Sequence, residues 1–503
     1  MKEWVDWNSC EEFPNLCELS LRSCPKLSGN IPKRLPLLKN VQIDGCGKLP
    51  ILVSNFPDLR ELEVEGSKGV ELKCLWSSGD EGPLPHLQFL RLLYIDNCPK
   101  LVSLVSEEVE ARLQQGTPSM LAEIVIKSCM VLKSLPKAMM YNNNCLQLIR
   151  IVKCDSLKHI ARGQLPPTLE RLEVSYCEKM ENILLEDSTD TTSQLEYLRI
   201  EYCPSLKSLT SCGELPRSLK HLNLLRCPQL ESIANRFHHN SFLECIEISY
   251  CENLQSLPTG INTLSTLRDI DIKNCRSLPL SLDRGLLPAN LRVLHISDSE
   301  KVSALPEAIH NLTSLEKLTL MPHCSVVPFL ETNLLTNLAS LTISAHDGNT
   351  DATFEWGLNN LISLDKLEIR KFQQFSFPRM MFPASLTILT ISDFPNLKHL
   401  SSKGFSKVVP LKELYISECR RLESFSKDGL PPSLLKLYIS QCEKLRSFPK
   451  KGLPPSLQEL YVFQCPMLAK SCEKDRGQEW WKIAHVLRVE FHTNLNLRPS
   501  DPL

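Results

Sequence analysis

The 503-residue sequence lacks any run of about eighteen apolar residues, so no segment predicts a membrane-spanning helix. Its first seven residues, Met1 to Trp7, are polar and aromatic and contain no apolar stretch of the kind found in secretory leaders. Net charge is almost absent as well, because 57 Lys and Arg residues nearly balance 58 Asp and Glu residues. A chain without a strong field gains little attraction to nucleic acid or to an anionic membrane. We therefore expect neither of them as a partner.

The motifs of common catalytic and metal-binding chemistry are also lacking. No C-x-x-C, H-E-x-x-H or G-x-S-x-G pattern occurs, so the sequence offers no motif that would supply zinc ligands or a hydrolase nucleophile. The phosphate-binding loop G-x-x-x-x-G-K-[ST] is absent too. The adjacent residues His238 and His239 are more typical of a solvated loop than of a metal site. We expect no catalytic residue, no cofactor and no metal, and we do not expect an enzyme.

Aromatic residues make up only 6% of the chain although 42% of it is hydrophobic, so the core must be built mainly from Leu and Ile. These residues recur at a fixed interval. Six successive leucines are each separated by twenty-four residues, namely Leu195, Leu219, Leu243, Leu267, Leu291 and Leu315. Each opens the phrase L-x-x-L-x-L-x-x-C-x-x-L, in which Ile can replace Leu. A fixed period of this length is typical of a solenoid, and this phrase is that of a leucine-rich repeat.

The phrase can be followed through most of the chain in nineteen copies. Their first leucines, called marker leucines below, are Leu16, Leu38, Leu59, Leu90, Leu121, Leu146, Leu169, Leu195, Leu219, Leu243, Leu267, Leu291, Leu315, Leu338, Leu364, Leu386, Leu411, Leu434 and Leu457. The pattern predicts a remnant of a preceding repeat at 1–15, an array at 16–468, a C-terminal cap at 469–497 and a disordered tail at 498–503. The stretch 321–364 fits the pattern least, as a tolerated irregular coil or as a hinge or interaction loop.

Apolar and polar residues alternate within each phrase, which predicts a short strand with one face buried. Copies one coil apart must then pair in parallel, and the remaining residues of each coil form the crossover that parallel pairing needs. Prolines mark many of these crossovers, as in Leu165-Pro166-Pro167, and favour extended backbone over helix. We expect an α/β fold, a curved leucine-rich-repeat solenoid with a parallel sheet on its concave face and mostly irregular or short helical convex segments.

Thirteen of the 21 cysteines fall at one position of the repeat. They are Cys24, Cys46, Cys98, Cys129, Cys154, Cys177, Cys203, Cys227, Cys251, Cys275, Cys419, Cys442 and Cys465. A cysteine repeated once per coil behaves as a small buried apolar residue, and a whole series of disulfides is disfavoured by their narrow geometry. We interpret these cysteines as reduced and structural, which indicates a reducing compartment.

Two groups of residues on the exposed strand positions are candidates for protein binding. Tyr415, Tyr438 and Tyr461 share one position in the last three repeats, with Phe463 beside them, and tyrosine is enriched in binding hot spots. The alternative is that such an aromatic column only stabilises the sheet. The second group comprises Arg171, Glu173, Tyr197, Arg199, Glu201, Glu247, Asp271 and Lys273. These charges form a recognition surface, or they merely neutralise one another.

The phrase L-x-x-L-x-I-x-x-C-x-x-L-x-S-L-P, together with Gly-Leu-Pro-Pro-Ser-Leu returns, resembles the repeat region of plant coiled-coil nucleotide-binding leucine-rich-repeat disease resistance proteins. The end of the chain resembles the usual ending of that family at Cys472, Gly477, Trp481, Ile483, His485 and Val486. Because the phosphate-binding loop of such proteins is missing, we expect a fragment without the nucleotide-binding module. The resemblance implies a cytoplasmic protein and a protein partner, either a pathogen effector, a guarded host protein or the receptor's own nucleotide-binding module.

The function that follows is that of a non-catalytic scaffold, the ligand-sensing and autoinhibitory repeat domain of an intracellular plant immune receptor. One alternative is the substrate-recognition half of an F-box ubiquitin ligase, because cysteine-bearing repeats occur there too, although no F-box is visible. A second alternative is an extracellular receptor ectodomain. The sequence Leu27-Ser28-Gly29-Asn30-Ile31-Pro32 matches the L-x-G-x-I-P of plant surface receptors, but it occurs once.

Overall fold

The computed structural model describes residues 13–27, 31, 35–46, 56–66, 72–76, 89–113, 120–141, 143–160, 165–183, 193–210, 213–238, 241–278, 287–297, 312–321, 335–344, 358–372, 382–400, 410–425, 429–474 and 476–492. The expected tail at 498–503 lies outside these residues, as do His239, most of the remnant at 1–15 and most of the stretch at 321–364.

The chain forms two compact units, Met1–Leu267 with Asn274–Leu278 and Arg268–Lys273 with Pro279–Leu503. The main strands of the first unit are β1 (Glu18–Arg22), β2 (Asn40–Asp44), β3 (Glu61–Glu65), β5 (Leu92–Asp96), β7 (Glu123–Lys127), β8 (Leu148–Val152), β9 (Arg171–Ser175), β10 (Tyr197–Glu201), β11 (His221–Leu225) and β12 (Cys245–Ser249). Those of the second unit are β13 (Asp269–Lys273), β14 (Val293–Ser297), β15 (Lys317–Met321), β16 (Ser340–Ser344), β17 (Lys366–Arg370), β18 (Ile388–Ser392), β20 (Glu413–Ser417), β22 (Lys436–Ser440), β23 (Glu459–Phe463) and β24 (Arg488–His492).

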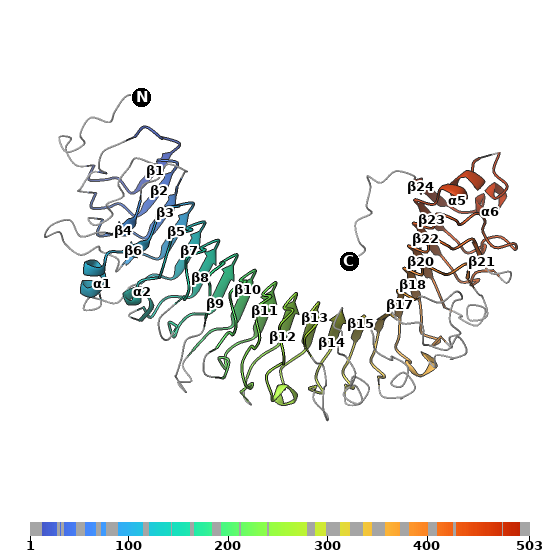
Figure 1. The fold of residues 1–503 in the computed structure, drawn as a ribbon. Helices are drawn as coiled ribbons and strands as arrows, with labels where there is room; N and C mark the ends of the chain where they lie inside the picture. The colour runs from blue at the N-terminus through green and yellow to red at the C-terminus, as the bar shows by residue number, and fades with distance from the viewer. Residues whose placement is uncertain are drawn as a thin grey trace. The chain divides into compact units, whose positions relative to one another are not determined.

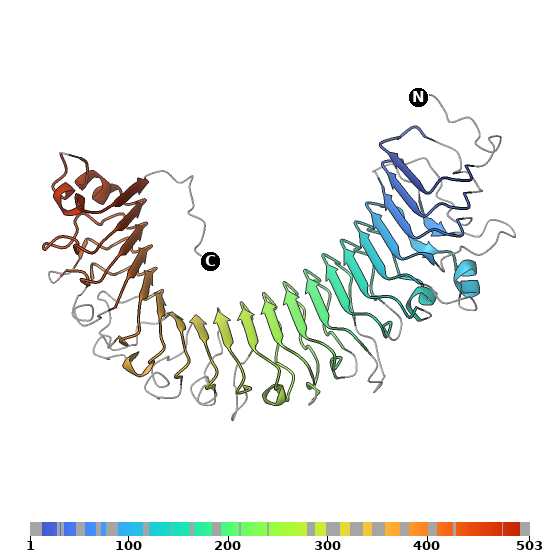
Figure 2. The same cartoon turned by 180° about the vertical axis from the view of Figure 1, so that it is seen from behind.

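Within each unit these strands pair in parallel with the next one along the chain, as β10 does with β11 and β22 with β23. The strands lie along one side of each unit and the returning segments along the other (Figures 1 and 2). The predicted leucine-rich-repeat solenoid with a parallel sheet and few helices is therefore confirmed.

The repeat sets the strand boundaries and the core. A five-residue strand begins two residues after every one of the nineteen marker leucines. Its second and fourth residues are buried from β2 onwards, as Leu198 and Ile200 are in β10. Its first, third and fifth residues point to the opposite side, which we call the strand face. In β1 the corresponding Leu19 and Leu21 are only half-buried, because no described residue pairs with the outer edge of that strand.

A residue with left-handed backbone follows most of these strands, with φ near +50° to +63°, and the sequence pattern did not indicate it. Its amide donates a hydrogen bond to the last carbonyl of the next strand, as Tyr202 does to Leu225 at 2.8 Å. The repeated cysteine comes next and is buried in twelve of thirteen coils, Cys24 being the exception. Its thiol commonly donates to the carbonyl two residues earlier, for example from Cys227 to Leu225 at 3.5 Å.

The returning segments contain little regular structure, as the prolines predict. The short helices are α1 (Glu107–Leu113), α2 (Lys137–Tyr141), η3 (Ile261–Thr263) and η4 (Leu358–Asn360). The short strands form two parallel pairs, β4 (Cys74–Trp76) with β6 (Ser103–Val105) and β19 (His399–Leu400) with β21 (Ser424–Phe425). No helix in the described part of the chain is long and apolar enough to cross a membrane.

The C-terminal segment contains two short helices, α5 (Pro466–Ser471) and α6 (Trp480–Ile483), before the final strand β24. The sequence pattern led us to expect only a helical cap after 468, yet β24 pairs in parallel with β23. Val486 stands two residues before this strand, where the other coils have a marker leucine, and this replacement hid the last strand. Within the expected cap, Trp481 is mostly exposed to solvent, whereas Ile483 is buried.

Candidate recognition surfaces

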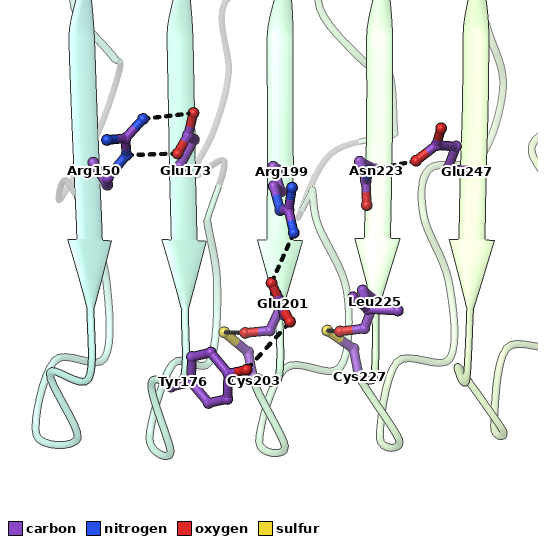
Figure 3. A network of polar contacts seen from close by, with 10 residues as sticks. All are labelled: Arg150, Glu173, Tyr176, Arg199, Glu201, Cys203, Asn223, Leu225, Cys227 and Glu247. Carbon is purple, nitrogen blue, oxygen red and sulfur yellow. Dashed lines mark hydrogen bonds and ion pairs between the residues drawn. The ribbon is translucent and has the colours of Figure 1, made fainter. Parts of the chain in front are cut away.

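The strand face of the first unit presents charged and polar side chains on β8 to β12, several of which contact one another (Figure 3). Arg150 on β8 donates two hydrogen bonds to Glu173 on β9, from Nε to Oε2 at 2.6 Å and from Nη2 to Oε1 at 3.2 Å. Burial of Glu173 opposes its ionisation, but the hydrogen bonds and charge of Arg150 outweigh that effect and lower its pKa. Sequence reasoning missed Arg150, although its place one strand before Glu173 could have revealed it.

The neighbouring strands continue this network. The guanidinium of Arg171 lies 4.4 Å from the ring centroid of Tyr197, and its Nη1 is 3.4 Å from Glu173. On β10, Arg199 Nη2 donates to Glu201 Oε2 at 2.9 Å. These expected residues therefore lie in contact across β9 and β10, with their opposite charges paired to one another.

The remaining members of the expected charged group lie apart from this cluster. Glu247 on β12 accepts a hydrogen bond from Asn223 on β11 at 2.5 Å. Asp271 and Lys273 lie on β13 in the second unit, where Lys273 Nζ donates to Asp271 Oδ2 at 2.7 Å. The group is therefore distributed over both units, and only its members on β9 and β10 form one contact network.

The expected tyrosines lie together on the strand face of the second unit. The ring of Tyr438 lies 5.8 Å from that of Tyr415, 6.4 Å from that of Tyr461 and 5.2 Å from that of Phe463. Burial raises the pKa of the Tyr438 phenol. A tyrosine phenol is protonated at neutral pH in any case, so it is able to donate a hydrogen bond there.

Three further residues belong to this column and were missed in the sequence. The imidazole of His492 stacks on Phe463 at 4.9 Å. Lys436 Nζ lies 6.0 and 5.5 Å from the Tyr415 and Tyr461 ring centroids, and Arg488 also approaches Tyr461 at 5.5 Å. His492 and Arg488 lie on β24, which the sequence did not reveal. These cations are themselves paired, Lys436 with Glu459 and both Arg488 and His492 with Glu490. The column thus combines aromatic area with charged groups of both signs, a combination suited to protein recognition.

Within the described residues, no three His, Cys, Asp or Glu side chains meet in a way that could hold a metal ion. The surfaces offer instead exposed rings and oriented hydrogen-bonding groups spread along several parallel strands. This arrangement is compatible with a contact surface for a macromolecule.

No protein-family model matches the chain. RPP13-like protein 1 of Arabidopsis thaliana, which is described as a disease resistance protein, is 31% identical over 138 residues, or 27% of this chain and 12% of that protein. A second Arabidopsis thaliana protein with the same description is 39% identical over 99 residues, or 19% of this chain and 7% of its own. Among solved structures, YopM from Yersinia enterocolitica shows 18% identity and a TM-score of 0.42, covering 95% of this chain and 91% of its own.

The chain therefore spans only a small part of the length of the plant relatives that it matches. Within that part it carries leucine-rich repeats similar to those of plant disease resistance proteins, as the sequence phrase predicts.

Proposed function

We propose that the chain is the ligand-sensing repeat domain of an intracellular plant immune receptor, and that it acts in the cytoplasm as a non-catalytic scaffold for protein recognition. Its partner is a pathogen effector, a guarded host protein or the nucleotide-binding module of the same receptor. The similarity to disease resistance proteins supports the receptor class. Buried repeat cysteines such as Cys154 and Cys203 are not joined in disulfides, which is compatible with a reducing compartment.

The observation that carries this proposal is the ordered network on the strand face of β8 to β10. The Arg150 and Glu173 side chains are fixed by a two-point contact that does not need a partner to form. A surface whose polar groups are already oriented loses less conformational entropy when it binds. Fixed, opposite charges also select a partner with the complementary pattern and reject others.

The test is a binding measurement whose probe is the nucleotide-binding module of a plant coiled-coil nucleotide-binding leucine-rich-repeat disease resistance protein. The purified chain should bind this module, and Arg199→Glu combined with Lys273→Glu should weaken the binding at least tenfold, or about 1.4 kcal/mol. The melting temperature should stay unchanged, because both residues lie in half-exposed pairs that contribute little to stability. A drop in melting temperature with unchanged binding, or no binding by the unaltered chain, would contradict the proposal.

A matched control lies on another part of the first unit. Lys158 forms an exposed ion pair with Glu181 outside the strand face, with an N···O distance of 2.7 Å. Lys158→Glu changes the chain's net charge in the same direction as each of the two test substitutions. It should leave the affinity for the module unchanged, which separates recognition at the strand face from a general effect of charge.

A further inference from the structure

A second surface lies at the carboxyl ends of four successive strands of the first unit. The residues that directly follow β9, β10, β11 and β12 are Tyr176, Tyr202, Arg226 and Tyr250. We call these four residues the tyrosine ledge. All four have left-handed backbone, with φ between +50° and +56°. Neither the repeat pattern nor the strand-face residues discussed above include them.

The ledge is exposed and its members contact one another. The three tyrosines are 37%, 46% and 44% accessible to solvent, respectively, in the order of the chain. The rings of Tyr176 and Tyr202 lie 5.4 Å apart, and the Arg226 guanidinium lies 5.6 Å from the Tyr250 ring centroid. Figure 3 shows Tyr176 beyond the end of its strand, where its hydroxyl donates to Glu201 at 3.3 Å. The ledge is thus a row of rings and one cation standing outside the core.

The fold does not require aromatic side chains at these positions. Other coils place Ser23, Ser128, Asn274 or Gln441 at the matching left-handed position. Left-handed backbone is tolerated best by Gly, Asn and Asp and is unusual for a bulky side chain. The solenoid requires left-handed backbone at this position but not an aromatic side chain, so the turn alone does not explain three tyrosines in four successive coils.

The positive charge of Arg226 favours a partner that carries a carboxylate. No carboxylate in the described part of the chain pairs with Arg226, nor with Lys153, which takes the same position after β8. The one carboxylate in contact with the ledge, Glu201, is already paired with Arg199. An incoming carboxylate would find Arg226 exposed beside the ring of Tyr250, where it could accept charge-assisted hydrogen bonds from the guanidinium.

The length of the ledge suits an extended peptide. Three strand spacings of roughly 4.8 Å place Tyr176 and Tyr250 about 14 Å apart, the span of four or five extended residues. Tyrosine and arginine are the residues most enriched in binding hot spots. We propose that the tyrosine ledge binds an extended acidic segment of a partner protein, whose apolar side chains lie on the rings and whose carboxylate pairs with Arg226. The ledge borders the strand-face network through the hydrogen bond from Tyr176 to Glu201. The inference itself rests on Tyr202, Arg226 and Tyr250, which are not members of that network.

The experiment selects random twelve-residue peptides displayed on phage against the purified full chain and then measures the recovered peptides one at a time by fluorescence anisotropy. The recovered peptides should combine Asp or Glu with aromatic residues or proline. Tyr202→Asn combined with Arg226→Gln should weaken their binding at least tenfold. Asn is well tolerated in left-handed backbone, so the variant should fold, and its melting curve checks this.

Two control variants test whether the loss of binding is specific to the ring and the charge of the tyrosine ledge. Tyr202→Phe retains the ring and should bind within twofold of the unaltered chain. Gln441→Ser changes the matching position of the second unit and should have no effect. The proposal is overturned if no acidic peptide is recovered, or if the recovered peptides bind the double variant as well as the unaltered chain. Binding of the neutral sugar cellohexaose in place of any acidic peptide would equally overturn it.

Discussion

At the scale of single residues, one buried ion pair stands apart from the many exposed ones. Glu479 and Lys482 lie in the C-terminal segment with side chains only 11% and 8% exposed and an N···O distance of 2.8 Å. The carboxylate of Glu479 also accepts the backbone amide of Phe448 at 2.8 Å. The pair therefore connects α6 to a coil that lies about thirty residues earlier in the chain. Both charged groups of the pair have hydrogen-bond partners in this buried site, so loss of one charge leaves the other buried and unpaired.

Glu479→Ala should therefore destabilise the C-terminal coils by about 3 to 5 kcal/mol, because it leaves the buried ammonium group of Lys482 without its negatively charged partner. Hydrogen exchange of the Phe448 amide measures this directly and should become faster. Lys158→Ala, which removes one member of an exposed pair, should change stability by less than about 1 kcal/mol. Equal effects of the two substitutions would show that the buried pair carries no special weight.

The buried thiols give the chain a pH dependence at alkaline pH. Burial raises the pKa of the Cys275 thiol to about 11 and that of Cys177 to about 12. Above about pH 8.5 the unfolded chain releases these protons whereas the folded chain keeps them. The stability that they contribute is therefore complete below pH 8.5 and falls as the pH rises, by up to about 1.4 kcal/mol per pH unit for each thiol.

The urea midpoint of unfolding should accordingly decrease between pH 8.5 and pH 10.5. In Cys275→Ala this decrease should be shallower, because one of the titrating groups is gone. A variant with the same slope as the unaltered chain would show that the thiol does not titrate on unfolding.

At the scale of the elements, each coil depends on the turn that follows its strand. The left-handed residue directs its amide to the next strand, as Lys153 does to the Ser175 carbonyl at 2.9 Å. The same turn brings the following cysteine, Cys154, into the core. A residue that resists left-handed backbone should therefore disturb both the strand pairing and the core.

Lys153→Val should destabilise the first unit by about 1 to 2 kcal/mol, because a β-branched side chain is strained at φ +54°. Lys153→Asn removes the same charge but suits this conformation, so it should leave the stability unchanged or raise it. Chemical unfolding of the two variants gives the comparison. Equal stability of the two would contradict the role assigned to this turn.

At the scale of the whole molecule, each coil packs only against its neighbours, and stability is a sum over adjacent coils. The coils on either side of β11 repeat at twenty-four residues, and their strands pair in the same register. Removal of residues 221–244 joins Lys220 to Cys245 and places β12 next to β10 with that register preserved. The core positions of the two strands, Leu198 and Ile246, should then face each other.

This whole-coil deletion should leave a folded chain, with a circular dichroism spectrum per residue like that of the full chain and a cooperative melt. Removal of residues 221–232 takes out half of the same coil and brings core and exposed positions out of phase, so it should abolish cooperative melting of the first unit. A whole-coil deletion that fails to fold would contradict the nearest-neighbour description.

The sequence predicted the features that follow from the period of the repeat. It separated the buried Ile246 and Ile248 from the displayed Glu247, because strand side chains alternate between two faces. It did not predict the left-handed turn at Tyr202, since backbone conformation there is set by the closure of each coil rather than by local residue preference. It also missed the contact of Arg150 with Glu173, which depends on the register between two coils.

The measurement that tests the central claim most directly is hydroxyl-radical footprinting of the chain, alone and bound to the nucleotide-binding module of a plant coiled-coil nucleotide-binding leucine-rich-repeat disease resistance protein. If the strand face is the recognition surface, Tyr197 and Tyr438 should lose reactivity in the complex. Phe242 and Ile362, which are exposed outside the strand face, should keep theirs. Protection of Phe242 or Ile362 with unchanged reactivity of both tyrosines would place the partner elsewhere and contradict the account.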